Sequence, residues 1–233
     1  MVNEISTLDG SIREQVDRHR RNKATDDSGR KWTSGAGDIL DLALTDKDYG
    51  AQATTSEIID QMKSFFFAGN DTTSAVMSWV YFYLSKTPHA LSSLRSELTH
   101  IFGPSSTPSE IAKQILDNPK LLNQMEYTLA VIRETLRLQP PAQPIRMTPF
   151  EYPIKLRNGQ EIVLEKGQPV LIASYVMARR TWIWGDDAAE FRPERFLGKE
   201  IPRAFMPFSK RPRDCIGTNL AYMEVTPQPR IVR

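Results

Sequence analysis

The sequence predicts a mainly helical protein with a small antiparallel β-sheet, an α+β fold. Apolar residues recur at helical spacing, between helix-capping motifs, over most of residues 4–138. The pattern then changes to two short strand-like runs, YPIKL at 152–156 and EIVLE at 161–165. Because an Asn158-Gly159 pair lies between these runs, they predict a hairpin with a tight turn.

The first region of the chain, residues 1–53, is predicted to be separate from the rest. It begins with an amphipathic helix over 4–22, where helical spacing relates Ile5, Leu8, Ile12 and Val16. The polar, glycine-containing segment 23–37 is typical of a linker. The sequence DILDLALTD at 38–46 then predicts a short helix.

Thr54 and Glu57 fit a capping box, so a long helix is expected from there to about Lys86. This helix carries the most apolar stretch of the chain, 65–85, which is long enough to suggest a membrane span. A polar run at 70–73 interrupts the stretch, and burying that run in lipid would be costly. The pattern therefore predicts a buried helix with a functional interruption.

Three more helices are predicted before the hairpin. The first lies between a Thr-Pro pair at 87–88 and a Gly-Pro pair at 103–104, which are start and stop signals. The second begins at a capping box formed by Thr107 and Glu110. The third covers 119–138 and ends at the prolines that follow.

After the hairpin, the run QPVLIASYVM at 168–177 predicts a third strand. Residues 181–214 hold prolines, charges and aromatic residues without a regular period, so we expect a long ordered loop, and such loops are usually functional. A helix is expected after Cys215. The prolines of an atypical tail, 226–233, should end it.

Composition narrows the function classes. With 40% hydrophobic and 25% charged residues, the chain of 233 residues has the balance of an ordinary soluble globular protein. A formal charge of +2 gives no general case for nucleic-acid binding. A single cysteine permits no internal disulfide bond, and the polar start of the sequence predicts neither a signal peptide nor a membrane anchor.

That cysteine, Cys215, lies in the segment FSKRPRDCIG at 208–217. Lys210, Arg211 and Arg213 precede it, and a helical pattern follows it. Basic neighbours and a helix N-terminus both favour the thiolate, which is the form that ligates a soft metal or a haem iron. An inert structural cysteine is the alternative interpretation of an isolated cysteine.

Four short motifs together resemble one family. The cysteine segment fits the pattern F-x-x-G-x-R-x-C-x-G of the cytochrome P-450 haem-thiolate monooxygenases at Phe208, Arg213, Cys215 and Gly217. The segments FRPERF at 191–196, ETLR at 134–137 and AGNDTT at 68–73 resemble the family's meander, its E-x-x-R pair and its oxygen-activating helix. The resemblance implies that 54–225 is a haem-binding core. It would be the C-terminal portion of the cytochrome P-450 fold, truncated relative to members roughly twice as long.

The resemblance also implies roles for single residues toward haem b. Cys215 would be the axial thiolate ligand of the iron, and Asp71 and Thr72 would handle protons during catalysis. The other cofactor-binding residues would be Phe208, Arg213, Arg146 and Gly217. A structural cluster that fixes the meander and the cysteine loop would be formed by Glu134, Arg137 and Arg195.

The implied function is insertion of one oxygen atom from O2 into a small apolar organic substrate, with NADPH electrons supplied by a flavoprotein reductase. No nucleic acid and no membrane anchor is expected here. An intracellular location is implied, although complete eukaryotic relatives, the fungal ones included, are typically bound to the endoplasmic reticulum. The alternative is a non-catalytic truncated fragment or pseudogene product that keeps the motifs without a complete haem pocket. Arg211, which stands where the family pattern has glycine, predicts weaker haem binding.

Overall fold

The computed structural model describes residues 2–25, 39–46, 52–198, 200–210 and 212–228. The fold is mainly helical with small antiparallel sheets, as predicted. Contacts within the chain divide it into two compact units, 1–70 and 71–233. The division falls inside a long helix, and the domain boundary expected at residue 54 stays a prediction.

The first unit is a small helical cluster. It consists of α1 (Val2–Thr25), α2 (Ile39–Thr45) and the first part of α3 (Thr55–Lys86). Its core is formed by Val16, Leu40, Ile58 and Ile59. The amphipathic helix predicted at the N-terminus is therefore confirmed and is slightly longer than expected. Of the predicted linker, 23–25 belong to α1 and 26–37 lie outside the described residues.

Helix α3 begins at the capping box that the sequence predicts. The backbone N–H of Thr54 donates to Glu57 Oε2 at 2.7 Å, and the N–H of Glu57 donates to Thr54 Oγ1 at 3.2 Å. Both bonds satisfy N–H groups that the first helical turn cannot satisfy itself. Among the described residues, no helix is both long and apolar enough to cross a membrane.

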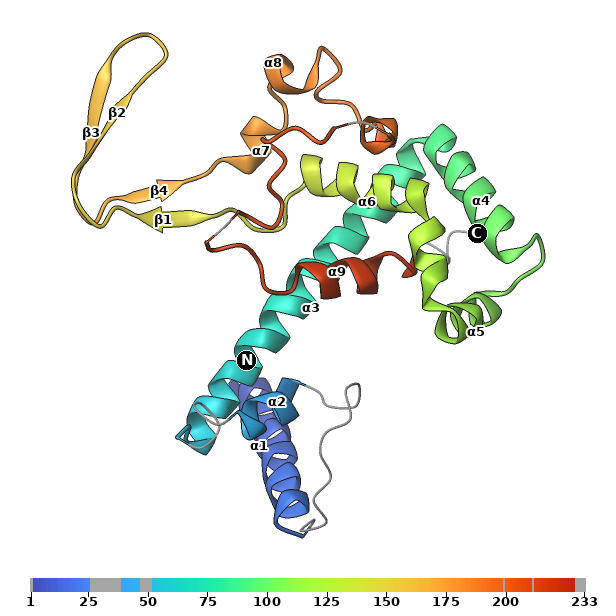
Figure 1. The fold of residues 1–233 in the computed structure, drawn as a ribbon, viewed down its shortest axis with the longest axis vertical. Helices are drawn as coiled ribbons and strands as arrows, with labels where there is room; N and C mark the ends of the chain where they lie inside the picture. Colours follow the sequence, from blue (N-terminus) through green and yellow to red (C-terminus); the bar gives the residue numbers. More distant parts are fainter. Residues whose placement is uncertain (1, 26–38, 47–51, 199, 211, 229–233) are drawn as a thin grey trace. The chain divides into compact units, whose positions relative to one another are not determined.

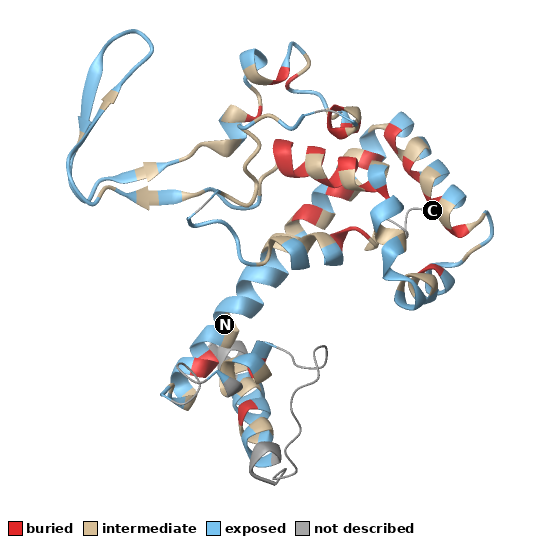
Figure 2. Cartoon of the chain, viewed as in Figure 1, coloured by how far each residue is buried: buried red, intermediate tan, exposed pale blue. Residues whose placement is uncertain are grey.

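The second unit packs helices around α6 (Glu126–Leu138), in which nine of 13 residues are buried (Figure 2). The partners of α6 in the main core are the rest of α3, α4 (Pro88–Phe102), α5 (Pro108–Asp117) and α9 (Thr218–Val225). Helix α5 also begins at its predicted capping box, which Thr107 and Glu110 form. Helix α9 ends at Val225, two residues before Pro227, as the sequence predicts.

The helix predicted over 119–138 is instead two elements. A 3-10 segment, η1 (Pro119–Gln124), comes first, and α6 begins only after Met125. Met125 adopts φ −84° and ψ 58°, which is not helical, and its side chain is almost fully buried. The break coincides with the burial of Met125 in the core, a tertiary contact that the local helical pattern does not encode.

The strands form two two-stranded sheets, and Figure 1 shows the β2–β3 hairpin beyond the outer end of the β1–β4 pair. The predicted hairpin is confirmed as β2 (Tyr152–Lys155) and β3 (Glu161–Leu164), with Gly159 in its turn at φ 83°. The predicted third strand is wrong in extent. Only β4 (Pro169–Leu171) is extended, it pairs with β1 (Ile145–Met147), and α7 (Ser174–Met177) follows it.

The long segment predicted as an ordered loop is mostly irregular. It contains two short elements, α8 (Thr181–Trp184) and the 3-10 turn η2 (Pro193–Phe196). Trp184 and Phe196 are buried with Ala130 of α6 and Ala188, so the segment has a small core of its own against α6. This core places η2 beside the polar residues of α6 that form the site.

Candidate functional site

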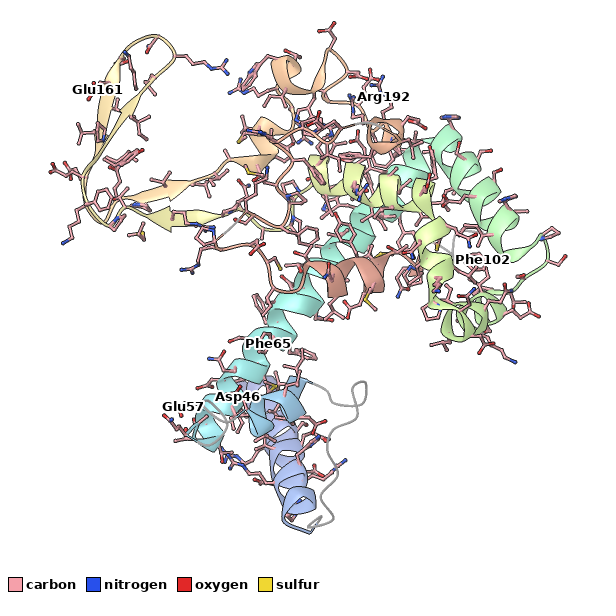
Figure 3. The ribbon with its side chains drawn as sticks, viewed as in Figure 1. Asp46, Glu57, Phe65, Phe102, Glu161 and Arg192 are labelled. Atoms are coloured by element: carbon pink, nitrogen blue, oxygen red, sulfur yellow. The ribbon has the colours of Figure 1, made fainter. Side chains whose placement is uncertain are left out.

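Glu134 and Arg137 form a buried ion pair on α6. The Glu134 carboxylate accepts from Arg137 Nε at 2.6 Å and from Arg137 Nη2 at 2.8 Å. Arg195 of η2 contacts the same carboxylate, with its Nε 3.2 Å from Glu134 Oε1. The backbone N–H of Arg192, labelled in Figure 3, also donates to Oε1 at 2.8 Å. The carboxylate is thus the shared acceptor of one helix and one distant loop.

Most of the remaining donors of the two arginines bind main-chain carbonyls. Arg137 donates to the carbonyl of Ala188 at 2.7 Å, to that of Glu190 at 3.0 Å, and also to that of Ala178. Arg195 donates to the carbonyl of Trp184 at 2.9 Å. A buried ion pair is tolerated only when its remaining donors are satisfied. Here those donors fix the course of the segment that leads to the cysteine loop.

Asp187 extends this network toward the surface. Its carboxylate contacts Arg195 Nη2 at 2.8 Å and Arg192 Nη1 at 2.6 Å. Burial alone would raise the pKa of Asp187, but the hydrogen bond and charge of Arg195, together with the charge of Arg192, lower it overall. The carboxylate therefore stays ionised and forms ion pairs with both arginines.

A side chain from another helix completes the N-terminus of α6. Met125 occupies the N-cap position and makes no capping hydrogen bond with its side chain. Instead, Glu97 of α4 accepts from the N–H of Tyr127 at 2.5 Å and from the N–H and hydroxyl of Thr128 at 2.9 and 2.6 Å. A carboxylate at a helix N-terminus also interacts favourably with the helix dipole. Glu97 therefore fixes the helix that carries the ion pair.

Cys215 lies in a short closed loop just before α9. Its N–H donates to the carbonyl of Phe208 at 2.9 Å, and its carbonyl accepts from the hydroxyl of Thr218, the first residue of α9, at 2.8 Å. The thiol itself is exposed. A Cβ at Gly217 would lie 3.8 Å from Sγ, in van der Waals contact, so glycine leaves that side of the sulfur open.

Phe208 joins this loop to the core of the second unit. Its ring lies 5.1 Å from the ring of Tyr222 on α9, between ring centroids. It also packs against the core cluster that includes Val76 of α3. Burial raises the pKa of Tyr222, and the nearby Arg133 opposes that shift only in part. The loop is therefore anchored at one end by aromatic packing and at the other by α9.

One arginine lies within the cysteine loop and another lies beside it. Arg146 of β1 donates from Nη2 to the hydroxyl of Ser209 at 3.0 Å, which brings β1 against the cysteine loop. Arg213 is exposed. Within the described part of the chain, neither guanidinium forms an ion pair with a carboxylate. Their charges are available to an anionic group.

The other predicted site residues lie on α3 or outside the described residues. Asp71 is exposed and Thr72 is half-buried, both within the continuous helix. A Cβ at Gly69 would meet nothing within 4 Å, so the helix surface there is open. Arg211, which was expected to weaken haem binding, lies outside the described residues.

A hollow of about 740 Å³ lies elsewhere in the second unit. It is lined by Thr73, Ser74, Met77, Tyr81, Ala112, Ile115, Leu116, Glu224, Pro227 and Gln228. None of these is a predicted site residue.

The sequence gives no sign of the roles of Glu97, Ser209 and Arg192. Glu97 lies in an ordinary amphipathic helix, and nothing local indicates that it caps α6. Ser209 has a backbone conformation, φ 63°, that residue type alone does not predict. Arg192 contributes its backbone N–H, which every residue except proline carries. All three act through contacts made far along the chain.

Comparison with known proteins gives the family. The model of the cytochrome P450 family matches residues 1–227. The chain is 34% identical to a cytokinin hydroxylase of Arabidopsis thaliana over 80% of its length and 35% of that protein. It is 28% identical to the cytochrome P450 monooxygenase acrF of Aspergillus aculeatus over 94% of its length and 48% of that protein.

A third relative, the bifunctional cytochrome P450/NADPH–P450 reductase of Aspergillus oryzae, is 31% identical over 96% of this chain and 20% of that protein. The chain thus spans less than half the length of each of these curated relatives. The family match nevertheless covers nearly the whole chain, including the buried ion pair and the cysteine loop. This chain belongs to the cytochrome P450 family.

Proposed function

We propose that this chain carries the haem-thiolate site of a monooxygenase, with Cys215 as the axial ligand of haem b. The observation that carries the proposal is the exposed thiol of Cys215 in a loop closed by its own N–H, with Gly217 leaving one side of the sulfur open. A thiolate is a ligand that haem iron accepts, and backbone groups around it tune its potential. An inert structural cysteine would instead be buried.

The residues around the loop fit the chemistry of haem. A haem group presents an iron atom, a flat apolar ring and carboxylates. The loop offers one sulfur ligand, and the residues after it expose apolar side chains, with Ile216 91% and Leu220 50% exposed. Arg146 and Arg213 supply guanidinium groups, whose planar donors suit carboxylates.

A metal ion held by side chains alone fits less well. In the part of the chain that the structure describes, no group of three or more His, Cys, Asp or Glu side chains could hold one. Structural zinc, for comparison, uses about four such ligands. A single cysteine is sufficient when a macrocycle supplies the other ligands.

When bound, haem supplies activation of O2 and insertion of one oxygen atom into the substrate. The residues of this chain position it and handle protons. On α3, the carboxylate oxygens of Asp71 and the hydroxyl of Thr72 are a proton-accepting and a proton-relaying group on neighbouring residues. Neither group is fully buried, so both can exchange protons with water.

The buried network of Glu134, Arg137 and Arg195 has a supporting role in this proposal. Its arginines hold the carbonyls of the segment that precedes the cysteine loop, so the network fixes the loop and takes no part in the chemistry. Loss of the network should therefore lower stability and haem retention together.

Substrate and electron donor are proposed from the relatives. One curated relative is named a hydroxylase, and another is named as a fusion with an NADPH–P450 reductase. We propose a small apolar organic substrate, since apolar pockets suit oxygen insertion into unactivated C–H bonds, and NADPH electrons that arrive through a flavoprotein reductase.

The test is a haem titration of the full chain followed by reduction and addition of carbon monoxide. A thiolate ligand gives a strongly red-shifted Soret band, and we expect this band for the unmodified chain. Cys215→Ala should abolish the band, whereas the exposed loop variant Ser105→Ala should retain it. Retention of the band in Cys215→Ala would refute the ligand assignment. Absence of the band in the unmodified chain would favour the non-catalytic alternative, which lacks a complete haem pocket.

A further inference from the structure

Ser209 has an unusual backbone for its residue type. Its φ is 63°, and among the described residues every other positive φ belongs to a glycine. A residue with a Cβ is disfavoured in this left-handed region, and only asparagine, aspartate and glycine visit it readily. Such conformations persist where surrounding contacts fix them, and they are concentrated at functional sites.

The contacts of Ser209 show what fixes it. Its N–H donates to the carbonyl of Met206 at 3.1 Å, and its hydroxyl accepts from Arg146 Nη2 at 3.0 Å. The neighbouring Phe208 carbonyl accepts from the N–H of Cys215. Ser209 is therefore the point at which the loop that carries the thiol meets the strand that carries Arg146.

Arg146 is held at both terminal nitrogens. Nη2 donates to Ser209 and Nη1 donates to the carbonyl of Ile145 at 2.9 Å. Its backbone is fixed by pairing with Val170 in the β1–β4 ladder. Every arginine carries five N–H donors, so donors remain after these bonds are made. Within the described residues no carboxylate pairs with this guanidinium.

We propose that Ser209 is a positioning residue for Arg146. Its left-handed backbone places the hydroxyl where it accepts from Nη2, and this bond holds the guanidinium beside the cysteine loop, ready to bind a carboxylate of the haem. The inference rests on the proposed function, because the carboxylate belongs to that cofactor. The Ser209 hydroxyl keeps its own proton while accepting, so it is a second donor for the same carboxylate.

A purely conformational role for Ser209 predicts different behaviour. If the loop needed only the left-handed backbone, glycine would serve at least as well, because glycine adopts a positive φ without steric cost. If the hydroxyl positions Arg146, glycine restores the backbone but loses the acceptor. Asparagine keeps both features, since it tolerates the left-handed region and its amide oxygen accepts hydrogen bonds.

The test compares haem with its dimethyl ester, in which both carboxylates are masked. Ser209→Gly should weaken binding of haem about threefold to tenfold, which is the effect of losing one hydrogen bond of typical net strength. It should leave binding of the ester unchanged. Ser209→Asn should bind haem with nearly the affinity of the unmodified chain, and Arg146→Ala should show the same selective loss as Ser209→Gly.

The outcomes separate this inference from the function on which it rests. If the unmodified chain gives no thiolate spectrum with haem, the proposed function is wrong, and the role of Ser209 is wrong with it. If the thiolate spectrum is present but Ser209→Gly binds haem and ester as the unmodified chain does, only the positioning role is overturned. If Ser209→Gly lost the same affinity for haem as for the ester, the positioning role would also be overturned, because such a loss would come from distortion of the loop and not from a lost carboxylate contact.

Discussion

The Glu134 carboxylate and the Arg137 guanidinium meet edge to edge, with Nε 2.6 Å and Nη2 2.8 Å from the two carboxylate oxygens, and at most 1% of either side chain is exposed. This geometry uses both oxygens and one full edge of the guanidinium. The opposite donors of Arg137 hold carbonyls of a segment more than 40 residues away in the chain. The pair thus fixes the position of the segment that leads to the cysteine loop.

Replacing Glu134 by alanine should strongly destabilise the second unit. The change leaves two buried guanidinium groups without their shared acceptor, and breaking a buried pair typically costs about 3–5 kcal/mol. For a chain of this size, that loss lowers the melting temperature by about 6–20 °C. Thermal unfolding followed by circular dichroism measures it.

The control for this variant is Glu161→Gln on the exposed hairpin, labelled in Figure 3, which should shift the melting temperature very little. A melting temperature for Glu134→Ala equal to that of the control would show that the pair contributes nothing to stability.

The capping carboxylate of α5 should make stability depend on pH. The N–H and then the hydroxyl of Thr107 donate to Glu110 and lower the pKa of its carboxyl below the ordinary value of about 4.3. Because the folded-state pKa is the lower one, the stabilisation is fully present above the ordinary pKa and is lost as the pH falls through the folded-state pKa.

Glu110→Gln should therefore unfold at a lower urea concentration than the unmodified chain at pH 7, and the difference should shrink as the pH approaches 3. Glu161→Gln should show no such convergence. The same difference between the Glu110 variant and the unmodified chain at both pH values would contradict the role assigned to the ionised carboxylate.

Replacing Gly217 by alanine should separate stability from cofactor binding. Gly217 has φ −83° and ψ 8°, which alanine adopts without strain, so the apoprotein should be unchanged or more stable by about 0.4–1 kcal/mol. The new methyl group would lie 3.8 Å from the Cys215 sulfur and cover its open side, so haem affinity should fall.

Urea unfolding and haem titration measure the two effects of this variant. Gly10→Ala is the control, because a Cβ there, unlike one at Gly217, meets nothing within 4 Å, and Gly10 lies on α1, far from the loop in sequence. Haem affinity that is equal in the Gly217 variant, the control and the unmodified chain would show that the open side of the sulfur is not needed.

Sequence alone predicts those parts of the fold that short motifs determine. The capping boxes at Thr54 and Thr107 and the Asn-Gly turn of the hairpin each depend on a few adjacent residues, and the structure contains all three. The break at Met125 and the pairing of β4 with β1 were missed. Each depends on contacts between segments that are distant in the chain, which local propensity does not encode.

The candidate site shows the same division. Glu134 and Arg137 are three residues apart on one helix, so their contact follows from helical geometry. The carbonyls that satisfy Arg137 and the hydroxyl that contacts Arg146 come from elsewhere in the chain. Residue spacing therefore predicts which side chains pair within one helix, and tertiary packing decides what completes their hydrogen bonds.

Because Glu97 of α4 caps α6, fraying of the first turn of α6 is coupled to the contact between α4 and α6. The amides of Tyr127 and Thr128 lie at the free end of α6, where a helix ordinarily frays and exchanges its hydrogens readily. Here those amides donate to a side chain of α4, so separation of α4 and α6 would expose them to solvent. Hydrogen exchange at these two amides therefore reports how often the interface between α4 and α6 opens. A faster exchange rate would show that the helix supporting the thiol loop has become less stable.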